Sequence, residues 1–348
     1  MPRRDPQEVA ERQALAQSPD RVELAVALAR AEIKRARGLS DPRYLGRAQA
    51  TLGRWWKLAE PPPDVLLLRA TIEQSLHDFK SARTDLDQLI AVRPDDAQAH
   101  LTRAVVATVT ADYTAARTSC AALEHLAAPL IVEACRAPLD AIEGDPDVAY
   151  RRLAAAVSDP SADPGLRAWA QGTLAELAIQ RGDEAGAATM LRGILSADPD
   201  DAYARAALAD VLMHQHEPAA ASALLKGFDQ IDNLLVRRAI AEHAVHGPDA
   251  TRLVQVMHDR IAAAAERHDR IHMREEAMFT LAVDHDIPHA LELARANWDV
   301  QKELADARLL ATAATAAGDV AAAAPVTSWA EAHHVHDARL TAAFGGAL

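Results

Sequence analysis

Apolar and polar positions along the chain follow a pattern that recurs. The stretch 63–96 reads as a helix, a short turn and a second helix, and the stretch that begins at 97 reads in the same way. Helices that bury one apolar face need a partner, and a short turn places two of them side by side. The pattern therefore predicts an all-α chain built from repeated antiparallel helix pairs.

Small residues mark the repeat. An alanine follows each predicted turn by three or four positions, and successive alanines are 33 to 38 residues apart, except for one interval of 69. In several units a second alanine lies twelve positions earlier, where it faces the neighbouring helix and allows close approach. The first set is Ala48, Ala82, Ala116, Ala149, Ala187, Ala221, Ala290 and Ala323, and the second is Ala70, Ala104, Ala137, Ala175, Ala209 and Ala311.

The turns between the helices carry capping residues. Glycine suits the left-handed residue that ends a first helix, and aspartate caps the start of the second. A proline followed by two aspartates closes some units, at 94–96 and 199–201. The glycine–aspartate turns are Gly144-Asp145, Gly182-Asp183 and Gly318-Asp319.

This combination of period, small residues, turn and closing proline resembles the tetratricopeptide repeat over about residues 20–335. The resemblance implies a right-handed α-solenoid of about 8–9 helix pairs. It extends to bacterial proteins of this type with no established role, and it supplies no catalytic residue. We expect an N-terminal segment or capping helix at 1–19, repeats at 20–231, a degenerate repeat at 232–270, repeats at 271–335, and a tail or cap at 336–348.

Some positions depart from the repeat. Pro138 falls inside a predicted first helix and Pro325 inside a second, so we expect each to kink or shorten its helix. Residues 232–270 lose the period and contain one long helical stretch after Gly247-Pro248. A local irregularity, with a bend, is therefore expected there.

Composition narrows the functional classes. Only 4% of the residues are aromatic and the net charge is −13, so the chain has few large core anchors and an acidic body that disfavours nucleic acid. No apolar run is long enough to span a membrane. The first residues contain no apolar leader, so the chain as given is expected in the cytoplasm, or outside it if a leader has been removed.

First helices line the concave side of such solenoids, which indicates a binding surface. Trp169 and Tyr203 lie at corresponding places of two consecutive units, each followed by an acidic residue. This arrangement favours a basic or amphipathic peptide, although aromatic residues near helix starts often pack between units instead. The predicted partner-binding residues are Trp169, Glu176, Gln180, Tyr203, Asp210 and Met213.

Histidines cluster late in the chain, where 12 of the 15 lie between His214 and His336. The best candidate metal pair is His268 and His272, one helical turn apart. No carboxylate lies at a spacing that completes a site, so scattered surface histidines are the favoured interpretation. Metal binding or a pH response is the alternative.

The two cysteines, Cys120 and Cys135, fall in adjoining units on helices that should touch. A disulfide fits that geometry, but we expect two buried free thiols, because cysteine is also a common core residue.

No phosphate loop, nucleophile elbow or cysteine–histidine arrangement with a known spacing occurs, so we expect neither an enzyme nor a cofactor. The sequence predicts a non-enzymatic scaffold or adaptor that binds a protein or peptide. Two alternatives stay open: the histidine-based solenoid, and an assembly subunit that forms homo-oligomers through its terminal repeats.

Overall fold

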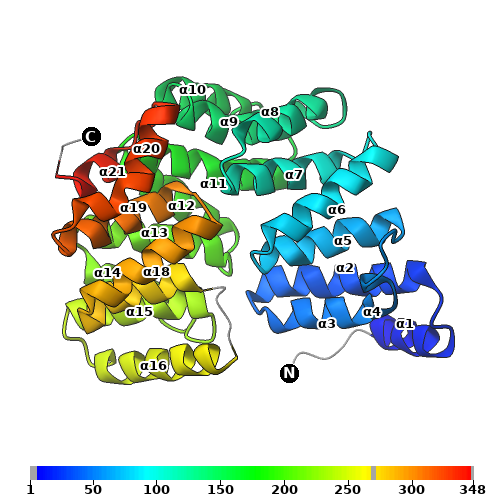
Figure 1. Ribbon diagram of the computed structural model, residues 1–348, viewed down its shortest axis with the longest axis horizontal. Coiled ribbons are helices and arrows are strands. Elements are labelled where there is room, and N and C mark those ends of the chain that lie inside the picture. The colour runs from blue at the N-terminus through cyan, green and yellow to red at the C-terminus, as the bar shows by residue number, and fades with distance from the viewer. Residues whose placement is uncertain (1–5, 268–271, 346–348) are drawn as a thin grey trace. The chain divides into compact units, whose positions relative to one another are not determined.

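The structure is a computed structural model that describes residues 6–267 and 272–345. The chain forms two compact units, Met1–Val106 (unit 1) and Ala107–Leu348 (unit 2) (Figure 1). In the described residues the secondary structure is helical and contains no strand. Within each unit consecutive helices pack in pairs and neighbouring pairs pack on each other, so the predicted all-α solenoid is confirmed.

A core of unit 1 forms where α2 and α3 meet α5. Leu45 of α3 and Leu52 directly after it pack there with Val65 and Ile72 of α5. The helices are α1 (Pro6–Gln17), α2 (Val22–Leu39), α3 (Arg43–Thr51), α4 (Gly53–Trp56), α5 (Pro63–Ser75), α6 (Phe79–Val92) and α7 (Ala97–Val109), whose last turn belongs to unit 2.

Unit 2 continues the alternation of first and second helices. Its helices are α8 (Tyr113–Ala122), α9 (Pro129–Ile142), α10 (Pro146–Val157), α11 (Pro164–Gln180), α12 (Glu184–Ala197), α13 (Ala202–His214), α14 (Pro218–Leu225), α15 (Asp232–Ala244), α16 (Ala250–Glu266), α17 (Met273–Phe279), α18 (Ile287–Val300), α19 (Leu304–Ala316), α20 (Ala324–His333) and α21 (Ala338–Ala343). A π-helical turn, Thr280–Asp284, extends α17, and short 3-10 turns lie at Leu123–His125 and Val320–Ala323.

The recurring alanines are buried at the helix contacts. All eight alanines that follow the turns are at most 1% exposed, and the six earlier ones are at most 3% exposed. Each of these helix contacts therefore holds only the methyl group of an alanine. Their predicted burial is confirmed.

Several turns between the helices contain one residue with left-handed backbone angles. Gly182 and Gly318 take left-handed φ angles of 81° and 66°, and the amide of the next residue donates to a carbonyl five positions back, as in Asp183 N to Ala178 O at 2.8 Å. The prediction is wrong for Gly144, whose φ is not in this region. Five histidines occupy the same left-handed position after other helices: His77, His216, His246, His285 and His334.

The departures from the repeat have different outcomes. Pro138 does not shorten α9, which runs from Pro129 to Ile142. Pro325 does shorten its helix, since α20 begins at Ala324 after a 3-10 turn. In the weakly periodic stretch, α15 and the long helix α16 contact each other as a pair, and the irregular π-helical turn follows α17 instead.

Cys120 on α8 and Cys135 on α9 form a disulfide, with their Cα atoms 5.7 Å apart. The expectation of two free thiols is therefore wrong. The reason is that α8 and α9 pack directly on each other and bring the two Cα atoms to a separation that a disulfide bridges. The predicted location of the cysteines on touching helices of adjoining units is confirmed.

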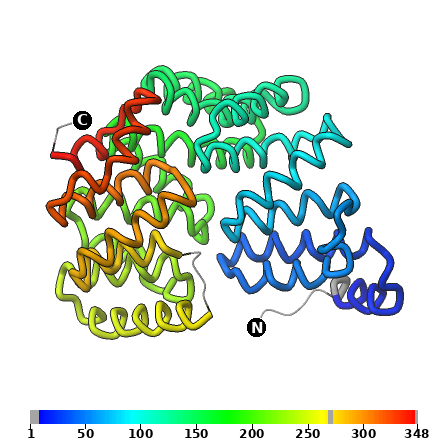
Figure 2. The backbone as a smooth tube through the Cα atoms, in the orientation of Figure 1, coloured from blue at the N-terminus to red at the C-terminus, as the bar shows by residue number. Residues whose placement is uncertain are grey.

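Within unit 2 the last helices return to the first ones (Figure 2). The Trp329 Nε1 of α20 donates to the Tyr113 hydroxyl of α8 at 2.9 Å, although the two residues are 216 positions apart. Lys302 N donates to Val109 O at 2.7 Å, and α21 contacts α11. Unit 2 is thus closed by contacts between its beginning and its end.

Candidate functional site

First helices share one surface in unit 2. Helix α13 contacts α15, α15 contacts α17, α17 contacts α19, α19 contacts α21, and α21 contacts α11. We call the surface formed by α11, α13, α15, α17, α19 and α21 the inner surface. It carries the predicted binding residues and a set of charged side chains.

One ion pair on this surface joins α13 to α15. Arg237 donates to both carboxylate oxygens of Asp210, from Nε at 2.8 Å and from Nη2 at 2.7 Å. Its Nη1 donates to the Asn233 side chain at 2.6 Å. Asp210 is thus neutralised by a bidentate partner, which reduces its capacity to hold a basic ligand.

A second ion pair joins α17 to α19. Arg274 donates to both oxygens of Asp306, at 2.6 and 2.8 Å, and also pairs with Glu303. Asp306 is buried and receives a further hydrogen bond from the Asn297 side-chain amide at 2.6 Å. These groups satisfy one another and hold the two helices in register.

The third group lies where α21 meets α11 and α19. Arg308 Nε donates to Asp337 Oδ1 at 3.0 Å. Gln180 Nε2 donates to the backbone oxygens of Ala141 and His336, both at 2.9 Å. Gln180 is therefore buried and occupied with structural hydrogen bonds, although the sequence indicated it as a contact for a partner.

Glu176 differs from these side chains. It is exposed, and it has no hydrogen bond or ion pair with another residue in the part of the chain that the structure describes. The surrounding helices limit its hydration and, together with the charge of Glu303, raise its pKa to about 7, against the opposing effect of Arg308 and Arg274. The carboxyl group of Glu176 therefore changes its charge near neutral pH.

Two aromatic side chains of this surface are unusually open. Trp169 on α11 is 43% exposed and Tyr203 on α13 is 57% exposed. The Tyr203 ring approaches Gly172 of α11, where an added Cβ would lie 3.9 Å from the ring. Met213, at the other end of α13, is partly buried against the core of α11–α15.

The six predicted residues thus separate into two groups. Trp169, Tyr203 and Glu176 are accessible, whereas the other three are buried, paired or packed. The sequence argument missed the arginines of the inner surface, Arg237, Arg274 and Arg308. Their separations of 37 and 34 residues, close to the repeat, were the signal that identifies them.

The histidines have mainly a structural explanation. His268 lies outside the described residues. His272 occupies the N-cap position of α17 without a side-chain capping hydrogen bond, and its Nδ1 lies 3.9 Å from Glu275 Oε2. The ring of His243 lies 6.4 Å from that of His246 and 6.2 Å from that of His285. Among the described residues no group of three histidine, cysteine or carboxylate side chains is placed to hold a metal ion.

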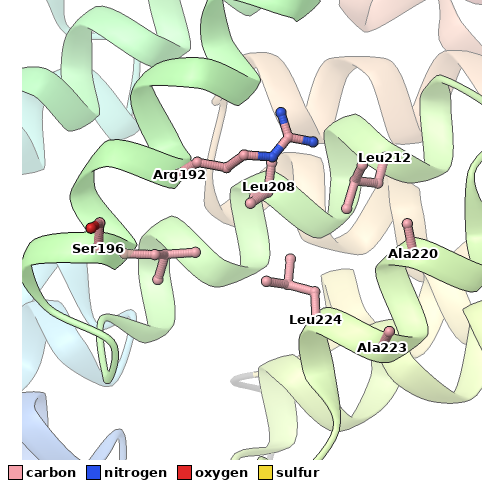
Figure 3. Close-up of a pocket in the computed structure, with 8 residues that line it drawn as sticks. Arg192, Ser196, Leu208, Leu212, Ala220, Ala223 and Leu224 are labelled. Atoms are coloured by element: carbon pink, nitrogen blue, oxygen red, sulfur yellow. The ribbon is translucent and has the colours of Figure 1, made fainter.

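A depression of about 480 Å³ lies between α12, α13 and α14 (Figure 3). Its floor is formed by Leu208 and Leu212, which are only 2% and 4% exposed and belong to the core. Arg192 lies at its edge. Because so little apolar surface is accessible, we interpret it as a seam between helices. The other lining residues are Leu195, Ser196, Ala220, Ala223 and Leu224.

Comparison with known proteins finds a family model that matches part of the chain, and similar solved structures. Residues 141–207 and 178–233 match a family model described as tetratricopeptide repeat. A tetratricopeptide repeat protein from Parabacteroides merdae is similar at 15% identity, over 72% of this chain and 84% of that one, with a TM-score of 0.35. The P58(IPK) TPR domain is similar at 16% identity, over 89% and 92%, with a TM-score of 0.24. No curated protein matches.

The described helices include none that is both long and apolar enough to span a membrane.

Proposed function

Because this chain carries tetratricopeptide repeats, which are protein-interaction modules, we propose that it is a non-enzymatic scaffold that holds a partner protein on the inner surface of unit 2. The observation that carries the proposal is the pair of open aromatic rings, Trp169 and Tyr203, one repeat apart beside the unpaired carboxyl of Glu176.

Trp169 and Tyr203 expose aromatic surface to water. An aromatic ring in water costs free energy that a partner recovers by covering it, and such rings dominate the energy of protein interfaces. Glu176 adds a preference for a basic side chain, since Asp210 is already neutralised by Arg237. The partner we propose is therefore a segment that carries apolar and basic side chains.

The other charges of the inner surface support a scaffold rather than an enzyme. Asp306 and Asp337 are buried and each receives two hydrogen bonds from an arginine of a first helix. Groups used in this way hold helices together and are not free to transfer protons. The proposed role is binding without chemistry.

The first test replaces both rings. We expect the double variant Trp169→Ala, Tyr203→Ala to recover at least about tenfold less partner from an extract of the source cells, because each lost ring removes about 2 kcal/mol of binding energy at a central contact. Val320→Ala, a change at an exposed apolar residue before α20, is the matched control. Recovery equal to that of the wild type, with an unchanged melting temperature, would exclude this site.

The second test uses pH. The pKa of Glu176 is about 7, so its carboxyl gains negative charge as the pH rises from 6 to 8, and a basic partner should bind more tightly over that range. Glu176→Gln should remove this dependence. A pH dependence that persists in the variant would assign it to another group.

A further inference from the structure

The last described residues of the chain lie against α11, α12 and α19 in the manner of a bound peptide. After α20 ends, His334 takes a left-handed φ of 53°, residues 335–337 are not helical, and α21 then begins at Ala338. This segment touches α11, α12 and α19, and its hydrogen bonds to α11 and α12 join residues 155 or more positions apart.

Three side chains of the segment are recognised individually. Asp337 receives Arg308 Nε at 3.0 Å and also caps α21 by accepting from Leu340 N at 2.6 Å. Arg339 Nε donates to Glu184 Oε1 at 2.7 Å. Leu340 is buried.

The receiving surface is shaped for a main chain. Gln180 donates to the backbone oxygen of His336 at 2.9 Å, which is a contact that any residue at that position supplies. A Cβ at Gly182 would lie 3.2 Å from the Cβ of Ala338, so glycine permits the close approach of α21. Together these contacts are made with the backbone of His336, the helix-capping Asp337, Arg339 and the buried Leu340.

We infer that the surface formed by Gln180, Gly182, Glu184 and Arg308 is a recognition surface for a partner segment of the form Asp-x-Arg-Leu at a helix start, and that residues 337–340 occupy it in cis. Gln180 lies one helical turn after Glu176 on α11, so the occupied surface adjoins the open one. The inference rests on the proposed function, because it names a partner segment for the same inner surface.

The test makes the segment exchangeable. A protease site is inserted between His334 and Val335, the full chain is folded, and it is then cleaved. A fluorescein-labelled peptide of residues 335–345 is added to cleaved and uncleaved protein, and its anisotropy is measured. We expect binding to the cleaved protein only, because the segment occupies its surface intramolecularly before cleavage.

Peptide variants test the recognised positions. Asp337→Ala and Leu340→Ala should each weaken binding at least about tenfold. Ala342→Ser, a change at an exposed position, should bind as the unchanged peptide does. An unrelated helical peptide that begins with Asp-x-Arg-Leu should compete, whereas a scrambled one should not.

Equal binding to cleaved and uncleaved protein, no binding to either, or an equal loss with Ala342→Ser would overturn the inference. The Trp169→Ala, Tyr203→Ala variant separates the two proposals, since cleaved protein with these changes should still bind the labelled peptide. Failure of the aromatic test and failure of the peptide test therefore have different meanings.

Discussion

At the scale of the residue, the turns carry an energetic conflict. Five histidines, at 77, 216, 246, 285 and 334, have φ angles of 50° to 61°, in the position that Gly182 and Gly318 fill elsewhere. A residue with a Cβ is disfavoured in the left-handed region, whereas glycine adopts it without steric cost. The helix contacts evidently hold these histidines in place.

His216→Gly should therefore raise the free energy of unfolding by about 1 kcal/mol, because it relieves the left-handed strain. Urea denaturation followed by circular dichroism measures the change. His258→Gly, in the middle of α16, is the opposite control and should lower the free energy of unfolding by more than that, since glycine weakens a helix interior and the hydrogen bond of the imidazole with Asp284 at 2.8 Å is lost. A destabilised His216→Gly protein would show that the imidazole has a role of its own.

The sequence predicted those residues whose role is local. The alanines at helix contacts follow from spacing alone, and their burial agrees. The ion-pair partners of Arg237 and Arg274 do not follow from spacing alone. These partners lie 27 and 32 positions away in the sequence, and their contacts depend on how neighbouring helix pairs pack. The hydrogen bond of Gln180 could not be predicted for the same reason, since its side-chain amide donates to a backbone oxygen 156 positions later.

At the scale of the element, a disulfide links helices α8 and α9. The Cys120–Cys135 disulfide closes a loop of 15 positions between these helices. A closed loop has fewer unfolded conformations, which raises the relative stability of the folded state.

Changing both cysteines to serine should lower the free energy of unfolding by about 2–4 kcal/mol. Denaturation of the oxidised wild type, the reduced wild type and the double variant distinguishes the contributions, since reduced wild type and variant should agree. Equal stability of all three would show that the bond adds nothing to the fold.

Helices were predicted with unequal success. The existence of the pairs followed from the period, and α16 was expected as a long helix. Pro138 was expected to kink or shorten its helix, and it does not shorten α9, which continues to Ile142 and contacts both α10 and α11.

At the scale of the whole molecule, unit 2 differs from an open stack because its ends meet. The buried Tyr113 hydroxyl accepts from Trp329, and the pKa of Tyr113 is raised to about 12, chiefly by burial. Tyr113→Phe should leave the Trp329 N–H without a partner and lower the free energy of unfolding by about 1–3 kcal/mol.

Amide hydrogen exchange shows which helices lose stability in the Tyr113→Phe protein. In the Tyr113→Phe protein we expect faster exchange in α20 and α21 as well as in α8, since the contact joins them. Tyr150→Phe is the matched control, because the Tyr150 hydroxyl has no hydrogen bond among the described residues, and its exchange should equal that of the wild type. Faster exchange confined to α8 would contradict a role of this contact in closing unit 2.

Closure also has a consequence in time. Ribosomal synthesis proceeds from the N-terminus at about 5–20 residues per second, so α11 emerges roughly 10–30 s before α21, which lies about 155 positions later. During that interval Gln180, Gly182 and Glu184 lack their contacts with residues 336–339. A nascent chain of this protein therefore exposes, for a short period, a surface that residues 336–339 cover in the finished chain. A partner segment with the side chains described above could bind this surface during synthesis.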